Sequence, residues 1–598
     1  MRKIIITFIS AVCISNSAFA QSVVSIDRAS QTSSGEGGNA DVGAPAISPN
    51  SDRIVFASFA SNLVSNDENS RADIFLKNLA TNEITRLTNA GIIDPNTGLV
   101  IESNGHSAAP TISTSSANGF FGVAFQSAAD NIGRKKVAFP DNNNKSDIYL
   151  SVPKRAFFLE RVSVGPNATE PNGDSMQASV AAVPLTRQFF VTYTSEATNL
   201  VEGDINGRDD IFLSKVTLPK GDVFNTAQHV TTERVGSGLD GSNPDARSLN
   251  PVISADGQFI VFESFATNMT SAPASNRKQI YLYNVATKAV TLISKDSAGN
   301  PGNELSQVPT ISFNGKFVVY ASRATNIVND GYVPEGDYLQ IFMFDVSTGQ
   351  TVRVNTSASG VPGNGESGNN VQAVVSPDGR FVLFSDTASN LIADDTNGVS
   401  DIFIKDLATA NVVRVNRAPG GGEANAGSLL PTFAKSSFNS TTGRASYASA
   451  ADNLISNDTE DRNDIFASTI TIPALPLSKT TRLEVPADLT LDANNKKAVV
   501  VLQAFSGVQA AQLRALFETE AAKSSAKKVR YQIKLTQLDV PKKKRDERTI
   551  LSKRNTLTIK SLKPGNYSMK YQAQTVKNDK VIQKTPYSPT VFFNTLDE

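Results

Sequence analysis

Residues 376–407 read SPDGRFVLFSDTASNLIADDTNGVSDIFIKDL. A Pro-Asp-Gly turn signal opens this stretch, and the apolar run Phe-Val-Leu-Phe follows it. A polar loop then carries three oxygen-bearing side chains, Asp395, Asn397 and Asp401, and the run Ile-Phe-Ile ends the stretch. Short runs rich in Val, Ile and Phe between turn residues are typical of strands. The stretch therefore predicts two strands joined by a polar loop.

The same phrase recurs along most of the chain. An asparagine that follows the first apolar run marks each copy, and its positions are regularly spaced: Asn62, Asn131, Asn199, Asn268, Asn326, Asn390 and Asn453. Each copy also has an aromatic residue in the second run: Phe75, Tyr149, Phe212, Tyr281, Phe342, Phe403 and Phe466. Seven repeats of about 65 residues predict a radial array of seven similar units.

The sixth copy shows what one unit contains. We expect strands at residues 372–376, 380–385, 401–407 and 412–416, with short turns after the first and the third. Four antiparallel strands repeated radially form a propeller blade. The last copy lacks a clean fourth strand, and residues 23–27 (VVSID) have the sequence of one. We therefore predict an all-β fold whose first domain, residues 21–478, is a seven-bladed β-propeller closed by its own N-terminal strand.

Three segments resemble a known repeat: Arg86-Leu87-Thr88, Ser376-Pro377-Asp378-Gly379-Arg380 and Asp401-Ile402-Phe403. They are similar to the TolB-type propeller repeat, in which an arginine-leucine-threonine strand leads to a serine-proline-aspartate-glycine turn. The resemblance covers roughly residues 21–478, and the polar loop between the second and third strands is a departure from it. It implies the propeller fold. It leaves function open, because such propellers serve as scaffolds, binding platforms and enzyme lids.

Residues 1–20 have the three parts of a secretory signal peptide: a basic start, an apolar stretch, and Ala18-Phe19-Ala20 before Gln21. A buried N-terminal helix is the alternative. The only cysteine, Cys13, lies inside this segment, so we expect a mature chain without disulfides or cysteine ligands. Export to a bacterial periplasm or exterior fits this composition. No later stretch has the roughly 20 apolar residues of a membrane helix, and we expect no transmembrane segment.

Charge separates the chain into two parts. Residues 479–598 carry 23 Lys and Arg against 11 Asp and Glu, a net charge of +12, and residues 21–478 carry −14. This asymmetry predicts two domains. The acidic character of the first domain argues against nucleic acid as a partner.

Residues 479–598 predict a β-sandwich with a helical insert. Strand patterns occur at residues 483–485, 489–491, 498–502, 529–537, 556–559, 567–574 and 590–594, and a helical pattern occupies residues 508–523. The segment from Leu557 to Tyr567 resembles the fibronectin type III pattern, in which the tyrosine would make a corner hydrogen bond. The helix and the absence of tryptophan are departures. The basic run at residues 541–545 is read as a solvated loop, with attraction to anionic surface polymers as the alternative.

The sequence offers no clear catalytic group. The mature chain has two histidines, His106 and His229, and both are interpreted as satisfied or solvent-facing. Ser107 follows Gly105 and His106, but the second glycine and the following helix of a nucleophile elbow are missing.

The polar loops are the best chemical candidates. Five copies follow the pattern D-x-(N/E)-x-x-x-D: Asp67, Asn69 and Asp73; Asp141, Asn143 and Asp147; Asp204, Asn206 and Asp210; Asp395, Asn397 and Asp401; and Asp458, Glu460 and Asp464. Oxygen ligands at this spacing suit calcium, although the loops are not EF-hands. The alternative is that Asp and Asn hydrogen-bond the backbone of their own turn. The fourth and fifth copies lack the pattern.

These observations favour an exported, non-catalytic binding or scaffold protein. We expect a monomer that recognises a protein or a cell-envelope polymer. The alternative is a propeller enzyme that acts on a polysaccharide or other envelope substrate through carboxylates at the channel mouth, because channel residues come from seven distant repeats.

Overall fold

The computed structural model describes residues 22–471 apart from 94–99, 115–119, 133–140, 154–157, 184–185, 220–228, 332–335, 337, 369–371, 435–441 and 459–461. From residue 488 onward it describes the backbone of eight strands. The chain divides into two compact units, Met1–Pro473 and Ala474–Glu598. The expected domain boundary at residue 478 and the signal-like segment 1–20 lie outside the described residues.

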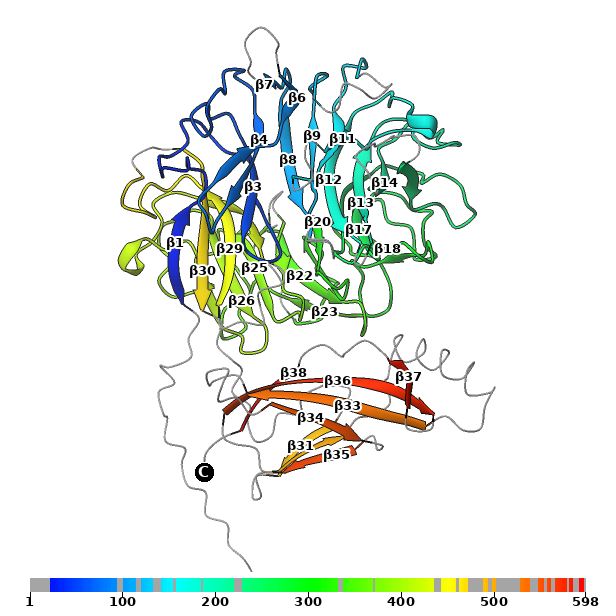
Figure 1. The fold of residues 1–598 in the computed structure, drawn as a ribbon, viewed down its shortest axis with the longest axis vertical. Helices are drawn as coiled ribbons and strands as arrows, with labels where there is room; N and C mark the ends of the chain where they lie inside the picture. The colour runs from blue at the N-terminus through cyan, green and yellow to red at the C-terminus, as the bar shows by residue number, and fades with distance from the viewer. Residues whose placement is uncertain are drawn as a thin grey trace, which may run out of the picture. The chain divides into compact units, whose positions relative to one another are not determined.

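Seven four-stranded antiparallel sheets make up the first unit (Figure 1). From the first strand to the fourth, the blades are: blade 1, β2 (Ala46–Ile47), β3 (Arg53–Ser58), β4 (Asp73–Asn78) and β5 (Ile84–Arg86); blade 2, β8 (Ser107–Ile112), β9 (Val123–Ser127), β10 (Asp147–Ser151) and β11 (Leu159–Arg161); blade 3, β12 (Ser175–Ala182), β13 (Gln188–Ser195), β14 (Asp210–Thr217) and β15 (Val230–Val235); blade 4, β16 (Ser248–Ile253), β17 (Phe259–Ser264), β18 (Gln279–Asn284) and β19 (Val290–Leu292); blade 5, β20 (Ser306–Ile311), β21 (Phe317–Ser322), β22 (Gln340–Asp345) and β23 (Gln350–Arg353); blade 6, β24 (Val374–Val375), β25 (Phe381–Asp386), β26 (Asp401–Asp406) and β27 (Val412–Arg414); blade 7, β28 (Ser428–Phe433), β29 (Thr442–Ser449), β30 (Asp464–Thr471) and β1 (Val23–Arg28). The predicted seven-bladed propeller is confirmed.

The N-terminal strand closes the ring, as predicted. β1 pairs antiparallel with β30, and Arg28 lies opposite Phe466. Figure 1 shows the blue β1 beside the yellow β30. The first strands of the blades contact one another in the circular order β2, β8, β12, β16, β20, β24, β28 and back to β2. They therefore surround the axis, and the fourth strands lie outside.

A repeated aromatic pair fills the middle of every blade. The aromatic residue of the third strand packs against one on the second strand, with ring centroids 5.9–6.1 Å apart. In blade 6 these residues are Phe384 and Phe403, which lie opposite each other in the register. All seven third-strand aromatics identified in the sequence are buried. Burial of apolar surface on both faces of each sheet explains why the runs are continuously apolar.

Glycine is required at the Pro-Asp-Gly turn. Gly379 has φ +73°, a left-handed conformation that side chains rarely adopt. A Cβ at this position would come within 2.5 Å of the Phe317 ring in blade 5. This turn therefore both reverses the chain and packs against the neighbouring blade.

The second unit contains two described sheets. The order of the first is β31 (Asp488–Asp492), β32 (Lys497–Val501) and β35 (Thr556–Lys560). The second contains β34 (Glu547–Ser552), β33 (Lys528–Gln537), β36 (Gly565–Lys577) and β37 (Lys580–Lys584), with β38 (Val591–Thr595) also paired to β36. β34 and β37 were not expected from the sequence. The predicted helix at 508–523 and the basic run at 541–545 lie outside the described residues.

A two-stranded hairpin, β6 (Asn89–Ile93) and β7 (Val100–Glu102), interrupts the connection from blade 1 to blade 2. The described part of the chain contains no helix of the length and apolarity that crossing a bilayer requires.

Candidate functional site

One face of the propeller carries the repeated asparagine and the polar loops. Antiparallel strands place the loop between the second and third strands of a blade on the same side as the connection to the next blade. We call this side the loop face, and the side with the two short turns of each blade the turn face. The repeated asparagine, the polar loops and the connections between blades all lie on the loop face.

The asparagine that marks each repeat fastens a blade to the connection that enters it. In blade 6, Asn390 Oδ1 accepts the Asn364 N–H (3.0 Å) and its Nδ2 donates to the Pro362 carbonyl (2.9 Å). The same two hydrogen bonds form at all seven positions. One side chain must satisfy a backbone donor and a backbone acceptor, which the amide group of asparagine does. This explains the marker residue of the repeat.

The polar loop of blade 6 surrounds an arginine. Arg414, at the end of the fourth strand, is fully buried and places Nη1 3.4 Å from Asp395, 3.1 Å from Asp401 and 2.8 Å from Glu423. Asn416 Nδ2 donates to Asp401 at 2.6 Å. Burial raises the pKa of Asp395 to about 6. Hydrogen bonds from the Thr396 N–H and hydroxyl lower the pKa of Glu423 to about 2. The loop carboxylates of blade 6 thus already form ion pairs with Arg414.

Blades 1 and 2 repeat this acid–arginine cluster. Arg86 lies 3.1 Å from Asp67, 3.5 Å from Asp73 and 2.5 Å from Glu102. In blade 2, Arg161 lies 3.3 Å from Asp141, 3.1 Å from Asp147 and 3.0 Å from Glu170. Burial raises the pKa values of Asp67 and Asp147 to about 6.

In blade 7 the arginine comes from the other end of the sequence. Arg28 of β1 lies 3.4 Å from both Asp458 and Asp464. The Ser30 hydroxyl donates to the second oxygen of Asp464. The predicted loop residue Glu460 lies outside the described residues. The strand that closes the ring therefore also completes the last cluster.

Blade 3 has the weakest cluster. Arg234 lies 3.6 Å from Asp204 and 3.8 Å from Asp210, because Asn243 occupies the place of the third acid and accepts from the guanidinium. Gly236 stands where other blades have a hydroxyl or amide donor. Both carboxylate oxygens of Asp204 are buried without a hydrogen bond from any described residue. Burial, together with the nearby charge of Asp204, raises the pKa of Asp210 to about 7.

The loop asparagines form hydrogen bonds with the backbone of their own turn, which was the alternative to calcium binding. The Asn69, Asn143, Asn206 and Asn397 Oδ1 atoms each accept the N–H of the residue two positions later, at 2.8–3.2 Å. Their Nδ2 atoms donate to the last aspartate of the loop and to the connection that follows the blade. Within the described residues, no three His, Cys, Asp or Glu side chains are grouped to hold a metal ion.

The arginines were missed in the sequence, although a signal was present. Arg86 follows Asp73, the last loop aspartate of blade 1, at the same spacing at which Arg414 follows Asp401 in blade 6. Each arginine lies directly opposite the buried aromatic residue of the third strand, for example Arg414 opposite Phe403. A cation repeated at an outer-strand position opposite repeated acids is the pattern of a buried ion pair. The arginine of blade 7 could be found only after the ring closure was known.

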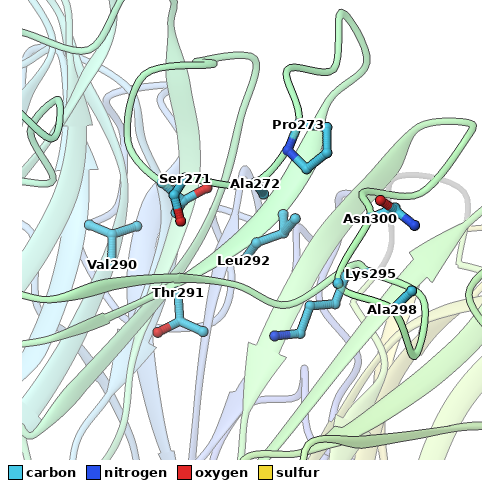
Figure 2. A pocket seen from close by; sticks show the side chains of 11 residues that line it. Ser271, Ala272, Pro273, Val290, Thr291, Leu292, Lys295, Ala298 and Asn300 are labelled. Atoms are coloured by element: carbon cyan, nitrogen blue, oxygen red, sulfur yellow. The ribbon is translucent and has the colours of Figure 1, made fainter.

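Blades 4 and 5 depart from the cluster in different ways. Blade 5 keeps its arginine: Arg353 Nε donates to Asp330 at 2.9 Å, and Gln340 replaces the last aspartate. Blade 4 has Gln279 at that position and Leu292 in place of the arginine, directly opposite Tyr281. A hollow of about 420 Å³ lies beside Leu292 in blade 4 (Figure 2).

Carboxylates nearest the axis also bind backbone. The residues that precede the first strands include Asp41, Asp174 and Glu366, which accept the N–H groups of Asn463, Ser146 and Leu339 from the preceding blade, at 2.7–3.2 Å. His106 occupies the same position, and its Nδ1 accepts the Ala72 N–H at 3.1 Å. This histidine is thus satisfied, in agreement with the interpretation of the sequence.

One buried carboxyl stands apart from the clusters. Asp386 at the end of β25 lies opposite Asp401, where the other six blades have serine: Ser58, Ser127, Ser195, Ser264, Ser322 and Ser449. Its carboxyl accepts from the Ser367 hydroxyl, from Asn355 Nδ2 (3.3 Å) and from the Ala388 N–H (2.7 Å). Complete burial raises the pKa of Asp386 to about 7.

Comparison with protein-family models and with curated proteins finds no match. Solved structures do match. A putative TolB from Agrobacterium tumefaciens is 14% identical, with 57% of this chain and 88% of that chain covered and a TM-score of 0.30. The Dos1 propeller is 9% identical (75% and 95% covered, TM-score 0.35), and a Mycobacterium tuberculosis puromycin-hydrolyzing peptidase is 9% identical (81% and 63% covered, TM-score 0.39). At these identities the likeness concerns the fold.

Proposed function

We propose that this protein is an exported, non-catalytic binding or scaffold protein that recognises a protein or a cell-envelope ligand with its loop face. The distribution of exposed apolar side chains supports this. Of the large apolar residues that are exposed in the described chain, five lie in loops of that face: Phe59, Ile205, Leu239, Tyr338 and Val361. The other three, Val24, Val352 and Leu429, lie on strands. An interaction surface needs exposed apolar side chains, and most of the large ones in the described chain lie on this face.

The loop face is also held rigid. Each loop between the second and third strands is tied by its asparagine to a connection, and six of them are tied by arginine as well. A surface that is ordered before binding loses less conformational entropy when it binds. The face therefore has the properties of a preorganised platform.

The carboxylates near the axis support the non-catalytic assignment. A general acid or nucleophile must be free to reach the reacting atom. The described carboxylates Asp41, Asp174 and Glu366 instead accept backbone hydrogen bonds from the neighbouring blade, and Glu366 also pairs with Arg323 at 3.3 Å. Their positions fit a role in joining blades.

The C-terminal unit enters the same proposal as a fibronectin-like spacer. Its two described sheets have antiparallel neighbours throughout, as a β-sandwich of this type requires. Export to the periplasm or exterior follows from the signal-like sequence at residues 1–20.

Affinity capture tests the function. The mature chain, immobilised and incubated with an envelope extract of the producing cell, should retain a defined protein or polymer. The triple variant F59S/I205S/L239S should reduce the captured amount at least tenfold, because it removes apolar contacts from the loop face. The matched control V24S/V352S removes exposed apolar groups from outer strands and should capture as much as the unaltered chain.

Two outcomes would contradict the proposal. Equal losses in the control and in the triple variant would show that the loop face has no special role. Shortening of a captured polysaccharide by the unaltered protein would identify an enzyme.

Calcium binding in the acidic loops stays a prediction. A calcium ion would have to compete with the arginine that already pairs with the loop aspartates. We expect blade 3 to be the strongest of the five loops, because Asp204 has two buried oxygens without a described hydrogen-bond donor. If calcium binds, EGTA should lower the unfolding midpoint, and D204N should abolish that difference while D141N should leave it intact. An equal midpoint with calcium and with EGTA would exclude the calcium hypothesis.

A further inference from the structure

Blade 4 lacks every charged member of the acid–arginine cluster at once. By position in the repeat, Pro273 replaces the first loop aspartate, Gln279 the last, Leu292 the arginine and Pro301 the third acid. The acids and the arginine are absent together, so no charge is left buried without a partner. The asparagine clamp of this blade, Asn268, is nevertheless intact, with bonds of 3.2 and 2.9 Å. The frame of the blade is thus kept while the charged groups of the cluster inside it are replaced by uncharged ones.

Pro273 and Leu292 line an open hollow of about 420 Å³ on the loop side of blade 4. Its walls come from the loop after β17 (residues 270–273), from β19 and from the connection to blade 5 (residues 295–300). Figure 2 shows Ser271, Ala272 and Pro273 on one side, Leu292 in the middle and Asn300 on the other side. The volume lies in the range of small-ligand sites. It suits one or two sugar rings or a group of similar size.

The charge of the residues that line the hollow disfavours cationic ligands. Lys295 is its one ionisable residue. Figure 2 shows this side chain extending below Leu292 toward Thr291. Its Nζ lies 5.8 Å from the centre of the Phe344 ring, and it forms no ion pair with any described carboxylate. The neighbouring Asp296 is outside the lining, and its carboxylate accepts from Asn300 and from the Ala298 N–H. An uncompensated ammonium group at a hollow attracts an anion.

The other groups favour a hydroxyl-rich ligand. Thr270, Ser271 and Thr291 supply hydroxyls that can donate and accept, while Leu292 and Pro273 supply an apolar base. A sugar ring has hydroxyls at its edge and C–H groups on its face, and a carboxylate on the ring would reach an ammonium group.

We propose that the hollow of blade 4 is a binding subsite for a carboxylate-bearing sugar unit of an envelope polysaccharide. This rests on the proposed function and specifies one ligand class for the loop face. Lys295 pairs with the carboxylate, the Ser and Thr hydroxyls bind the ring hydroxyls, and Leu292 supports the ring face. Among the described blades, blade 4 is the one that has leucine in place of the cluster arginine, which distinguishes this position from its equivalents.

Calorimetric titration of the full mature chain with trigalacturonate tests the proposal, with neutral galactotriose as the comparison. We expect saturable binding of the acidic probe at least tenfold tighter than that of the neutral one. K295Q should weaken trigalacturonate binding about tenfold or more, because it removes a charge-assisted contact. T291W, an aromatic substitution on an exposed strand position, should fill the hollow and abolish binding.

Matched controls separate these effects from general damage. V352W places the same side chain at the equivalent position of blade 5, and K288Q removes a lysine from the turn face of blade 4; both should bind trigalacturonate like the unaltered protein. Unchanged binding by T291W, equal binding of the two sugars, or equally tight binding of a polyglutamate peptide would each overturn the assignment.

The capture experiment distinguishes the two levels of inference. If T291W retains the same envelope material as the unaltered chain, the loop face binds elsewhere and the subsite proposal falls alone. If the unaltered chain captures nothing from the envelope, the proposed function falls, whatever the titration shows.

Discussion

Replacing Arg414 by leucine should lower the free energy of unfolding by about 3–5 kcal/mol, because removing one partner of a buried ion pair leaves its counter-charge uncompensated. Arg414 has no exposed side-chain surface and contacts Asp395, Asp401 and Glu423. Leucine cannot replace any of these contacts. Urea denaturation, followed by the fluorescence of the 12 tyrosines in a chain without tryptophan, measures the change.

The chain itself supplies the control for this prediction. Blade 4 has the pair Gln279 and Leu292 at the positions of Asp401 and Arg414. The double variant D401Q/R414L therefore transfers a natural combination into blade 6 and should recover at least half of the lost stability. An R414L variant as stable as the unaltered protein would show that the cluster contributes nothing to stability.

Replacing Asp386 by serine should make the stability of the propeller less sensitive to pH between about 4 and 7. The pKa of Asp386 is about 7 in the folded chain and 3.8 is its ordinary value, so the carboxyl stabilises the fold when it is protonated. That stability is fully present below about pH 4, is lost as pH rises through 7, and is absent above it. Over this window the loss is about 4 kcal/mol.

Serine has no carboxyl group to titrate in this pH range. The other six blades have serine at this position, so the fold accommodates it. In five of them a serine hydroxyl at this position bonds to the serine that begins the first strand, as in Ser107–Ser127 at 2.8 Å. The difference in unfolding free energy between D386S and the unaltered chain, measured at pH 4, 6 and 8, should shift by about 3–4 kcal/mol in favour of the variant. The other buried acids titrate in both proteins, so their contribution cancels in the difference between the two unfolding free energies. A difference that does not change with pH would disprove the assignment.

The blades were predictable because their signals are local and repeated. The runs around Phe384 and Phe403, the turn at Gly379 and the recurring asparagine each reflect contacts within one blade or with the next. Even the closure by β1 could be inferred, because an outer strand was missing at one end of the array and present at the other.

The interior of the clusters was harder to predict. The acids Asp395 and Asp401 have the spacing of metal ligands, and only the register shows that Arg414 lies between them. The hollow of blade 4 is harder still, since the loop after β17, the strand β19 and the connection to blade 5 meet around it only in the folded blade. The role of Asn390 was likewise hidden, because its partners are backbone atoms of residues 362 and 364.

The closure of the ring has a consequence for how the protein is made. Arg28 reaches the acids of Asp458 and Asp464, which lie at the opposite end of the propeller sequence. During synthesis β1 emerges first and its partner β30 emerges last among the blades, so the strand must stay unpaired while six blades form. Contacts this distant in sequence slow folding. Until β30 is made, the partly synthesised propeller is an open array with two unpaired edges.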